Sequence, residues 1–418
     1  MKILIASWGS YGDVYPYVGL ALALKARGHE PRLAMPGFYR DLVESIGFPL
    51  HPIGPPIDPA DRALVARLID PVRGPEALLA DLVAPAVRQD YDVLDAAARD
   101  ADVMVTHPIT FAAPVVAQMR RLPWASTVLA PMSFFSAHDP PVLAPVPALI
   151  HLRRLGSWYG TLLARLGRAR TRAWMRPVDA LRHDVGLPPG EHPLFEGQFS
   201  PYLTLALFAR VLATPQPDWP PHVNVTGFVF YNGPETLDAN VEAFLADGPP
   251  PVVFTLGSSA VHAAGAFYEE SVQAAARLGV RAVLLTGGVE QNRPTCGVSK
   301  DILVIDRAPH QLLFPRAAAV VHQGGAGTTG QALRAGRPML VVPHAHDQPD
   351  NAFRTARTGG ARICYPSNYK AARVERELRR LLDDGGYADR AAATAAIVRA
   401  EDGAATAVEM IEAAIAQS

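Results

Sequence analysis

Short apolar runs suited to buried strands recur along the chain in two series, and segments long enough for helices separate them. Such runs are typical of parallel strands covered by helices on both faces. The first series comprises residues 2–6, 32–35, 103–106, 125–129 and 202–207. The second comprises residues 252–256, 282–285, 302–305, 318–321 and 339–342. The pattern predicts an α/β protein with two doubly wound, Rossmann-like domains.

The boundary between the domains is expected in a proline-rich stretch. Residues 215–234 predict a semi-rigid linker that contains one short strand. We therefore expect an N-terminal domain over residues 1–214 and a C-terminal domain over residues 235–403. The length of 418 residues agrees, because one hydrophobic core seldom serves so long a chain.

The first strand leads through a turn with two glycines into a helix expected over about residues 16–27. Asp13 lies in this turn, and open α/β sheets bind ligands beyond the carboxyl ends of their strands. Asp13 is therefore a candidate general base. The alternative is that Asp13 only caps the helix that follows.

The most informative segment, residues 322–351, joins a glycine-rich turn to the start of a helix. The backbone N–H groups around Gly324, Gly325 and Gly327 have no partner within the helix. They lie at the positive end of the helix dipole, beside the hydroxyl of Thr328. Such a site attracts phosphate. The segment predicts a cradle for a pyrophosphate group.

Side chains on either side of the turn extend this site. His322 precedes the glycines and can donate from its ring to a phosphate oxygen, while Asp347 and Gln348 suit sugar hydroxyls. The ordered histidine, glycine pair, threonine pair, proline and Asp-Gln resemble the donor-binding motif of the family 1 glycosyltransferases. That resemblance implies the two-domain GT-B fold and a nucleotide-diphosphate sugar as donor, with the N–H groups of Gly325, Ala326, Gly327 and Thr328 on the diphosphate.

The resemblance also extends to the first domain. Many members carry a histidine where this chain has Asp13, and several bacterial members carry an aspartate. His107 stands at about the place of the aspartate that histidine-type members pair with their base. His107 is thus a second catalytic candidate, which would orient Asp13 or the acceptor, and a purely structural role is its alternative.

Further donor contacts follow from the resemblance. Ser258 matches the phosphate-binding Ser/Thr of the family, with a plain helix cap as the alternative. Residues 307–312, with Ala308 and His310, look like the loop that meets the nucleobase. Plant relatives hold the ribose with a glutamate where this chain has Gly330, so uridine and deoxythymidine donors both stay open. UDP-glucose and dTDP-rhamnose are the donors expected first.

The acceptor is expected to be hydrophobic. Residues 129–145 and 345–354 resemble the rhamnolipid-type rhamnosyltransferases and related natural-product and sterol enzymes. The expected acceptor contacts are Tyr11, Met132, Phe134 and Phe135, with ordinary packing as the alternative. By resemblance, a last helix over about residues 404–418 crosses back onto the first domain.

Bulk properties exclude other classes. A net charge of −1 offers no basic field for nucleic acid. The two cysteines, Cys296 and Cys364, have no metal-ligand spacing, and the first residues lack the features of a signal peptide. We expect a cytoplasmic protein with no metal site and no cofactor beyond the co-substrate. Residues 151–177 carry many arginines and no acid and predict a basic amphipathic helix, which either rests on the inner membrane face or is solvated surface.

These observations favour an inverting, metal-independent transfer of a hexosyl group from a UDP- or dTDP-sugar to a hydroxyl of a hydrophobic small molecule. The acceptor class is open among phenolic, terpenoid or sterol, polyketide and hydroxy-lipid compounds. One alternative is a nucleotide-sugar 2-epimerase of the same architecture, and another is a non-catalytic nucleotide-sugar-binding protein. Oxidoreduction is disfavoured, because the chain lacks a GxGxxG fingerprint followed by a ribose-binding acid.

Overall fold

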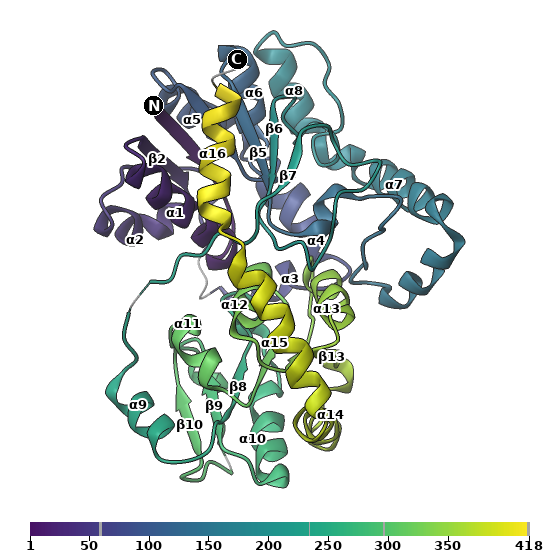
Figure 1. The fold of residues 1–418 in the computed structure, drawn as a ribbon. Helices are drawn as coiled ribbons and strands as arrows, with labels where there is room; N and C mark the ends of the chain where they lie inside the picture. The colour runs from purple at the N-terminus through teal and green to yellow at the C-terminus, as the bar shows by residue number, and fades with distance from the viewer. Residues whose placement is uncertain (58–60, 234, 296, 416–418) are drawn as a thin grey trace.

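The computed structural model describes residues 1–57, 61–233, 235–295 and 297–415, which form two parallel sheets, each flanked by helices (Figure 1). The first sheet has the order β3-β2-β1-β4-β5-β6-β7, and the second has the order β10-β9-β8-β11-β12-β13. The predicted α/β architecture with two Rossmann-like domains is confirmed. In both sheets the strand order reverses beside the first strand, and the crevice at such a switch point is where ligands bind.

The strands are short and lie close to the predicted apolar runs. The first sheet contains β1 (Lys2–Ala6), β2 (Glu30–Met35), β3 (Leu50–Pro52), β4 (Val103–Thr106), β5 (Trp124–Val128), β6 (Leu203–Ala206) and β7 (Val223–Val225). The second contains β8 (Val252–Thr255), β9 (Ala282–Leu285), β10 (Ile302–Ile305), β11 (Ala319–His322), β12 (Met339–Val341) and β13 (Ala361–Ile363).

The helices occupy the crossovers between strands. In the first half they are α1 (Tyr11–Ala26), α2 (Arg40–Ser45), α3 (Arg62–Leu68), α4 (Gly74–Leu78), α5 (Val87–Ala97), α6 (Ala112–Arg120), α7 (Ser157–Thr171) and α8 (Arg176–Asp184). In the second half they are α9 (Ala239–Ala246), α10 (Phe267–Leu278), α11 (His310–Leu313), α12 (Ala326–Ala335), α13 (Gln348–Arg357), α14 (Ala371–Asp383), α15 (Gly385–Ala400) and α16 (Gly403–Ile415). No helix among the described residues has the length and apolar character needed to cross a bilayer.

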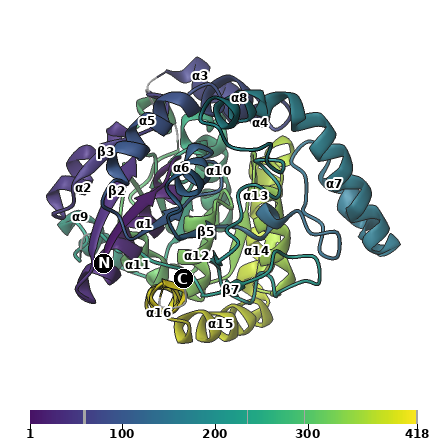
Figure 2. The same cartoon turned by 90° about the horizontal axis from the view of Figure 1, so that it is seen from above.

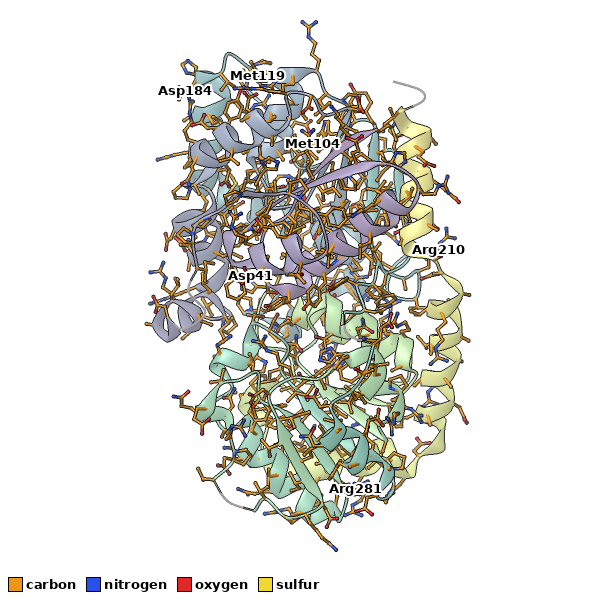
Figure 3. All side chains as sticks on the ribbon, turned by 90° about the vertical axis from the view of Figure 1, so that its left-hand side faces the viewer. Asp41, Met104, Met119, Asp184, Arg210 and Arg281 are labelled. Atoms are coloured by element: carbon orange, nitrogen blue, oxygen red, sulfur yellow. The ribbon has the colours of Figure 1, made fainter. Side chains whose placement is uncertain are left out.

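Both faces of each sheet are buried, which explains why the strands are continuously apolar. On β4, Met104 and its neighbour Val105 point to opposite faces and belong to different hydrophobic clusters. Val253 and Phe254 on β8 divide in the same way. Figure 3 shows side chains filling both layers, with Met104 in the interior.

Helix α1 begins at Tyr11, earlier than the expected start at about residue 16. Ser10 is its N-cap, and the Asp13 carboxylate accepts from the Ser10 backbone N–H at 2.8 Å. This capping box satisfies a donor at the helix start and allows the helix to begin one turn sooner. The predicted loop position of Asp13 is therefore wrong, because Asp13 lies in the first turn of α1.

The chain passes between the domains twice. The strand expected within residues 215–234 is β7, which pairs with β6 at the edge of the first sheet. At the other end, α16 returns to the first domain and buries Ala407, Val408 and Ile411 in the cluster that contains strand β1 (Figure 1). A Cβ on Gly403 would lie 2.5 Å from the Gly227 carbonyl oxygen, so the two crossings touch. Residues 416–418 of the expected last helix lie outside the described residues.

The basic segment over residues 151–177 is not one helix. A 3₁₀ helix (Pro147–Leu155) ends at Gly156, whose φ of 77° breaks the helical path before α7 begins. A further 3₁₀ turn (Arg172–Met175) follows α7. The prediction of a single helix is therefore wrong, because it overlooked the glycine. Figure 2 shows α7 at the periphery of the molecule.

Candidate active site

A cavity of about 1800 Å³ lies between the two sheets. Its walls are the loops that follow β1 to β5 in the first domain and β8 to β12 in the second. The carboxyl ends of both sets of parallel strands therefore face one space, as expected for a ligand site.

The two oxygens of Asp13 have different surroundings in this cavity. Oδ2 accepts from the Ser10 N–H at 2.8 Å and from the Ser10 hydroxyl at 3.0 Å. Oδ1 lies 3.8 Å from His107 Nε2. The Asp13 side chain is 38% exposed, whereas that of His107 is 6% exposed. One oxygen thus caps the helix and the other stays available, so the capping and catalytic interpretations are compatible.

The surroundings of His107 fix where its ring proton sits. The Ile109 N–H donates to Nδ1 at 3.4 Å, which assigns the proton of the neutral ring to Nε2, on the side of Asp13. The Tyr17 ring packs edge-on against the imidazole at 5.8 Å. Burial alone would raise the pKa of Asp13, but the interactions with His107 and Ser10 outweigh it and lower that pKa. Asp13 is therefore ionised at neutral pH and able to accept a proton.

The expected cradle is the start of α12. Gly325 is the N-cap, and Ala326, Gly327 and Thr328 form the first turn and line the cavity. Gly324 does not line it and instead makes the turn: its φ is 87°, and a Cβ there would meet the Gln348 carbonyl oxygen at 3.0 Å. The free N–H groups of this first turn point a positive partial charge at the cavity.

His322 is buried behind the cradle. The Gly324 N–H donates to its Nδ1 at 3.1 Å, so the ring proton is assigned to Nε2, a buried atom that has no hydrogen-bond partner among the described residues. Burial lowers the pKa of His322 to about 3, with His310 adding to the shift. His322 is therefore a neutral imidazole with an unused N–H donor, which is costly unless a ligand accepts from it.

Asp347 and Gln348 lie at the start of α13 and line the cavity. Gln348 Oε1 accepts from the backbone N–H groups of His344 at 2.9 Å and Ala345 at 3.2 Å, which directs the amide. Burial, and then the charge of Asp13, raise the pKa of Asp347 to about 7. The carboxyl group of Asp347 can thus donate or accept near neutral pH.

Asp347→Asn should stabilise the protein at neutral pH. Because the folded-state pKa lies above the ordinary value, stability is present at low pH and is lost as pH rises through about 7. Asparagine cannot ionise, so the variant should gain about 1–3 kcal/mol over the wild type at pH 8 and much less at pH 5. Urea unfolding at both pH values measures this, and a gain independent of pH would contradict it.

Of the other donor candidates, Ser258, Ala308 and His310 line the cavity, whereas His322 is 0% exposed and lies behind the wall rather than in it. Ser258 follows β8, and Ala308 and His310 follow β10. The His310 ring stacks on Phe314 at 4.3 Å, and burial lowers its pKa to about 4. A Cβ on Gly330 would lie 2.8 Å from the Phe228 ring, so no side chain fits at the position of the plant glutamate.

Three of the four expected acceptor contacts line the cavity, namely Tyr11, Met132 and Phe135. Phe134 does not, because the residue is only 7% exposed and its ring stacks on Trp219 at 4.0 Å inside the core. The expectation that Phe134 meets the acceptor is therefore not met. Packing of a large ring against a tryptophan wins over exposure to the cavity.

Sequence reasoning missed much of the wall. His346 has a φ of 53° and its Nε2 lies 2.8 Å from the Leu68 carbonyl oxygen across the cavity. Unusual backbone of this kind gathers at functional sites, but it leaves no mark in the sequence. Other missed lining residues are Trp8, Phe38, Tyr39, Ile53, Ile57, Trp174, Phe195, Tyr231 and Gln323. The Gly-Pro-Pro after β3 was the available signal for part of them.

Among the described residues, no three His, Cys, Asp or Glu side chains gather in a way that could hold a metal ion. Cys364 is buried, and Cys296 lies outside the described residues.

Known proteins resemble this chain over most of its length. Residues 261–414 match the family model described as erythromycin biosynthesis protein CIII-like, C-terminal domain. The O-mycaminosyltylonolide 6-deoxyallosyltransferase of Streptomyces fradiae is 35% identical over 99% of this chain and 97% of its own. The chain belongs to the family 1 glycosyltransferases. It is an enzyme of the natural-product and sterol type that transfers a sugar to an acceptor.

Other relatives agree with this membership. Glycosyltransferase GtfE of Amycolatopsis orientalis is 32% identical over 86% of this chain and 85% of its own. A sterol 3-beta-glucosyltransferase of Emericella nidulans is 27% identical over 98% of this chain and 30% of its own. The glycotransferase of kitacinnamycin shares the fold, with a TM-score of 0.74 at 22% identity over 99% of both chains.

Proposed function

We propose that this glycosyltransferase transfers a hexosyl group with inversion from a UDP- or dTDP-sugar to a hydroxyl of a hydrophobic small molecule. One observation carries the proposal: the starts of α1 and α12 meet across the cavity. A Cβ on Gly327 would lie 3.4 Å from the Gly12 Cα atom. The carboxylate of Asp13 and the positive end of α12 thus share one small region.

In the proposed reaction, Asp13 Oδ1 takes the proton of the acceptor hydroxyl as its oxygen attacks the anomeric carbon. The bond between that carbon and the diphosphate oxygen breaks on the opposite face, which inverts the configuration. The negative charge of the departing diphosphate is stabilised by hydrogen bonds from the N–H groups at the start of α12, from Ser258 and from the Nε2–H of His322. These donors supply the stabilisation without a metal ion or a further cofactor.

The proposal that either uridine or deoxythymidine nucleotides serve as donor rests on the surroundings of Gly330. With Phe228 against Gly330, no acid is available there to select a ribose 2′-hydroxyl. The spinosyn rhamnosyltransferase, similar in fold at a TM-score of 0.70 and 19% identity over 99% of this chain and 100% of its own, is complexed with thymidine diphosphate. UDP-glucose and dTDP-rhamnose are the first donors to test.

The acceptor is proposed from the size and lining of the cavity. A volume of about 1800 Å³ exceeds the roughly 300–1,000 Å³ of most small-molecule pockets, so it can hold a donor and a bulky acceptor together. The first-domain wall is rich in aromatic side chains, with Tyr11 in contact with Tyr15, Phe38 and Tyr39. Phenolic, terpenoid or sterol, polyketide and hydroxy-lipid acceptors all suit such a wall.

A thermal-shift panel of nucleoside diphosphates and their sugars tests the proposal. UDP or dTDP at about 100 times its Kd should stabilise the folded state by about 2.7 kcal/mol. Product analysis with a phenol, a sterol and a macrolide aglycone should then show a glycoside. Epimerised donor without acceptor would favour the 2-epimerase, and binding without any turnover would favour a sensor.

We also propose that the enzyme works in the cytoplasm and touches the inner membrane face through the segment around α7. Apolar side chains are exposed there, among them Leu152, Leu155, Trp158, Leu162 and Leu166. The neighbouring arginines give the segment an excess of positive charge, although Arg153, Arg168, Arg170 and Arg172 are paired with acids. Salt-sensitive co-sedimentation with anionic phosphatidylglycerol vesicles is expected, and Trp158→Ser should weaken it. Equal pelleting with neutral vesicles, or none at all, would refute the contact.

A further inference from the structure

The first turn of helix α13 is hydrogen-bonded to the glycine-rich turn that precedes α12. The side-chain amide of Asn351 donates to the Gly324 carbonyl oxygen at 2.9 Å and to Asp347 Oδ2 at 2.7 Å. Asp347 and Gln348 line the cavity on the side proposed for the donor sugar. A ligand that contacts this first turn therefore acts directly on the position of α13.

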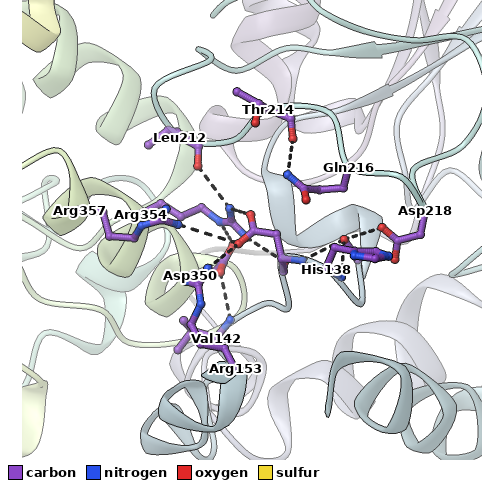
Figure 4. A network of polar contacts seen from close by, with 12 residues as sticks. His138, Val142, Arg153, Leu212, Thr214, Gln216, Asp218, Asp350, Arg354 and Arg357 are labelled. Carbon is purple, nitrogen blue, oxygen red and sulfur yellow. Dashed lines mark hydrogen bonds and ion pairs between the residues drawn. The ribbon is translucent and has the colours of Figure 1, made fainter. Parts of the chain in front are cut away.

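One turn further along, α13 reaches into the first domain (Figure 4). Asp350 Oδ1 accepts from the Val142 backbone N–H at 3.0 Å, and Arg354 Nε donates to Asp350 Oδ2 at 2.7 Å. The guanidinium of Arg354 also donates to the Asp139 carboxylate and, at 3.3 Å, to the Leu212 carbonyl oxygen. The side chains of Arg354 and Asp350 are 2% and 0% exposed.

These bonds hold the middle of a loop whose two ends line the cavity. We call residues 129–145 the acceptor loop. Met132 and Phe135 precede its bound middle, and Leu143 to Pro145 follow it on the cavity wall. Asp218, in the stretch predicted as the linker, accepts from the Ser136 hydroxyl at 2.7 Å and from the Ala137 N–H at 2.6 Å. Residues 139–142 of the acceptor loop are instead bound by Asp350 and Arg354 of α13, in the second domain. We call this set of bonds the anchor.

The chemistry of the anchor favours a positioning role. Burial alone would lower the pKa of Arg354, but Asp350 and Asp139 outweigh it and raise that pKa, so the charge is permanent. Buried ion pairs add little net stability over apolar packing and are better attested as fixing a register. The planar fork of arginine can bond two carboxylates and a carbonyl at once, which the point charge of lysine cannot reproduce.

We propose that Arg354 and Asp350 couple occupancy of the sugar site to the position of the acceptor loop, which makes Arg354 a positioning residue for transfer. The inference rests on the proposed function in placing the donor sugar at Asp347 and Gln348. A sugar held there would fix α13, and the anchor would fix the acceptor loop in turn.

Hydrogen exchange tests the coupling without turnover. In the wild type, UDP-glucose or dTDP-rhamnose should slow exchange at residues 136–142 more than UDP or dTDP does. Arg354→Lys and the milder Asp139→Asn should lose this slowing and exchange faster there without ligand. Arg357→Met is the matched control, because Arg357 is 53% exposed and lies 3.9 Å from Asp139, and it should behave as the wild type.

Kinetics then separate positioning from folding. Arg354→Lys should raise the acceptor KM and lower kcat by up to about 100-fold, as for a displacement of about 1 Å at the reacting atoms, with donor affinity kept. Equal slowing of exchange in Arg354→Lys and wild type, or unchanged acceptor kinetics, would overturn the coupling. Failure of every nucleotide to bind would refute the proposed function and the coupling together, whereas binding without slowed exchange would overturn the coupling alone.

Discussion

Asp13→Asn is expected to lower transfer by about 10²–10⁴-fold, the usual contribution of a general base. Asparagine keeps an oxygen that can accept from Ser10, so the start of α1 should survive, but it cannot take a proton. The affinity for the sugar nucleotide, measured by calorimetry, should stay nearly unchanged, because the groups proposed to bind its diphosphate belong to the second domain. Retained turnover would show that the base is another group.

A matched control separates catalysis from capping. Ser10→Ala removes the hydroxyl that bonds Asp13 Oδ2 and leaves Oδ1 in place. It should cost about 1 kcal/mol of stability with transfer largely kept. In the wild type, His107 and Ser10 hold the pKa of Asp13 low, so the rate should persist on the acid side and be lost only as pH falls through that lowered pKa.

His322→Phe is expected to lower kcat by about 10²–10³-fold, the usual effect of losing one donor to a developing negative charge. Among the described residues the buried Nε2–H of His322 has no partner, but Nδ1 accepts from the Gly324 N–H, so the substitution should also cost about 1–3 kcal/mol of stability without ligand. His322→Gln places an N–H near the same point and should recover part of the rate. Steady-state kinetics with calorimetry of the nucleoside diphosphate measures both effects.

The control for this substitution is another histidine on a strand. His51 is half-buried on β3 and lies outside the cavity lining. His51→Phe should leave transfer and nucleotide affinity unchanged. If His322→Phe kept full activity, the diphosphate would have to be held by the backbone of α12 and Ser258 alone.

The fold could be predicted because its main signal is local. Continuous apolar runs such as residues 282–285 are buried on both faces of a sheet, and only a few architectures provide that. The short strands β3 and β13 were not predicted, because Leu-His-Pro and Ala-Arg-Ile are not continuous apolar runs. The start of α1 was misplaced because its capping box depends on Ser10 and Asp13 together rather than on apolar spacing.

Site residues could be predicted where they lie at the end of a strand or the start of a helix, as Asp13 and residues 325–328 do. The nearness of His107 to Asp13 was expected only from the family resemblance, and the pairing of β1 with β4 explains it in the structure. Phe134 could not be assigned, because one ring among neighbours turns to Trp219 and the next faces the cavity. The anchor at Arg354 joins residues more than 200 positions apart, and no local pattern reports such a pairing.

The contact of Gly227 with Gly403 limits how the two domains can move relative to each other. Both covalent passages between the halves run through one point, so sliding or twisting of one half past the other would strain two backbones at once. Rotation about an axis through that point would spare both passages but would have to break the bonds from Asp350 and Arg354 to the acceptor loop. Any opening of this kind would therefore tie the entry of a bulky acceptor to the release of the acceptor loop.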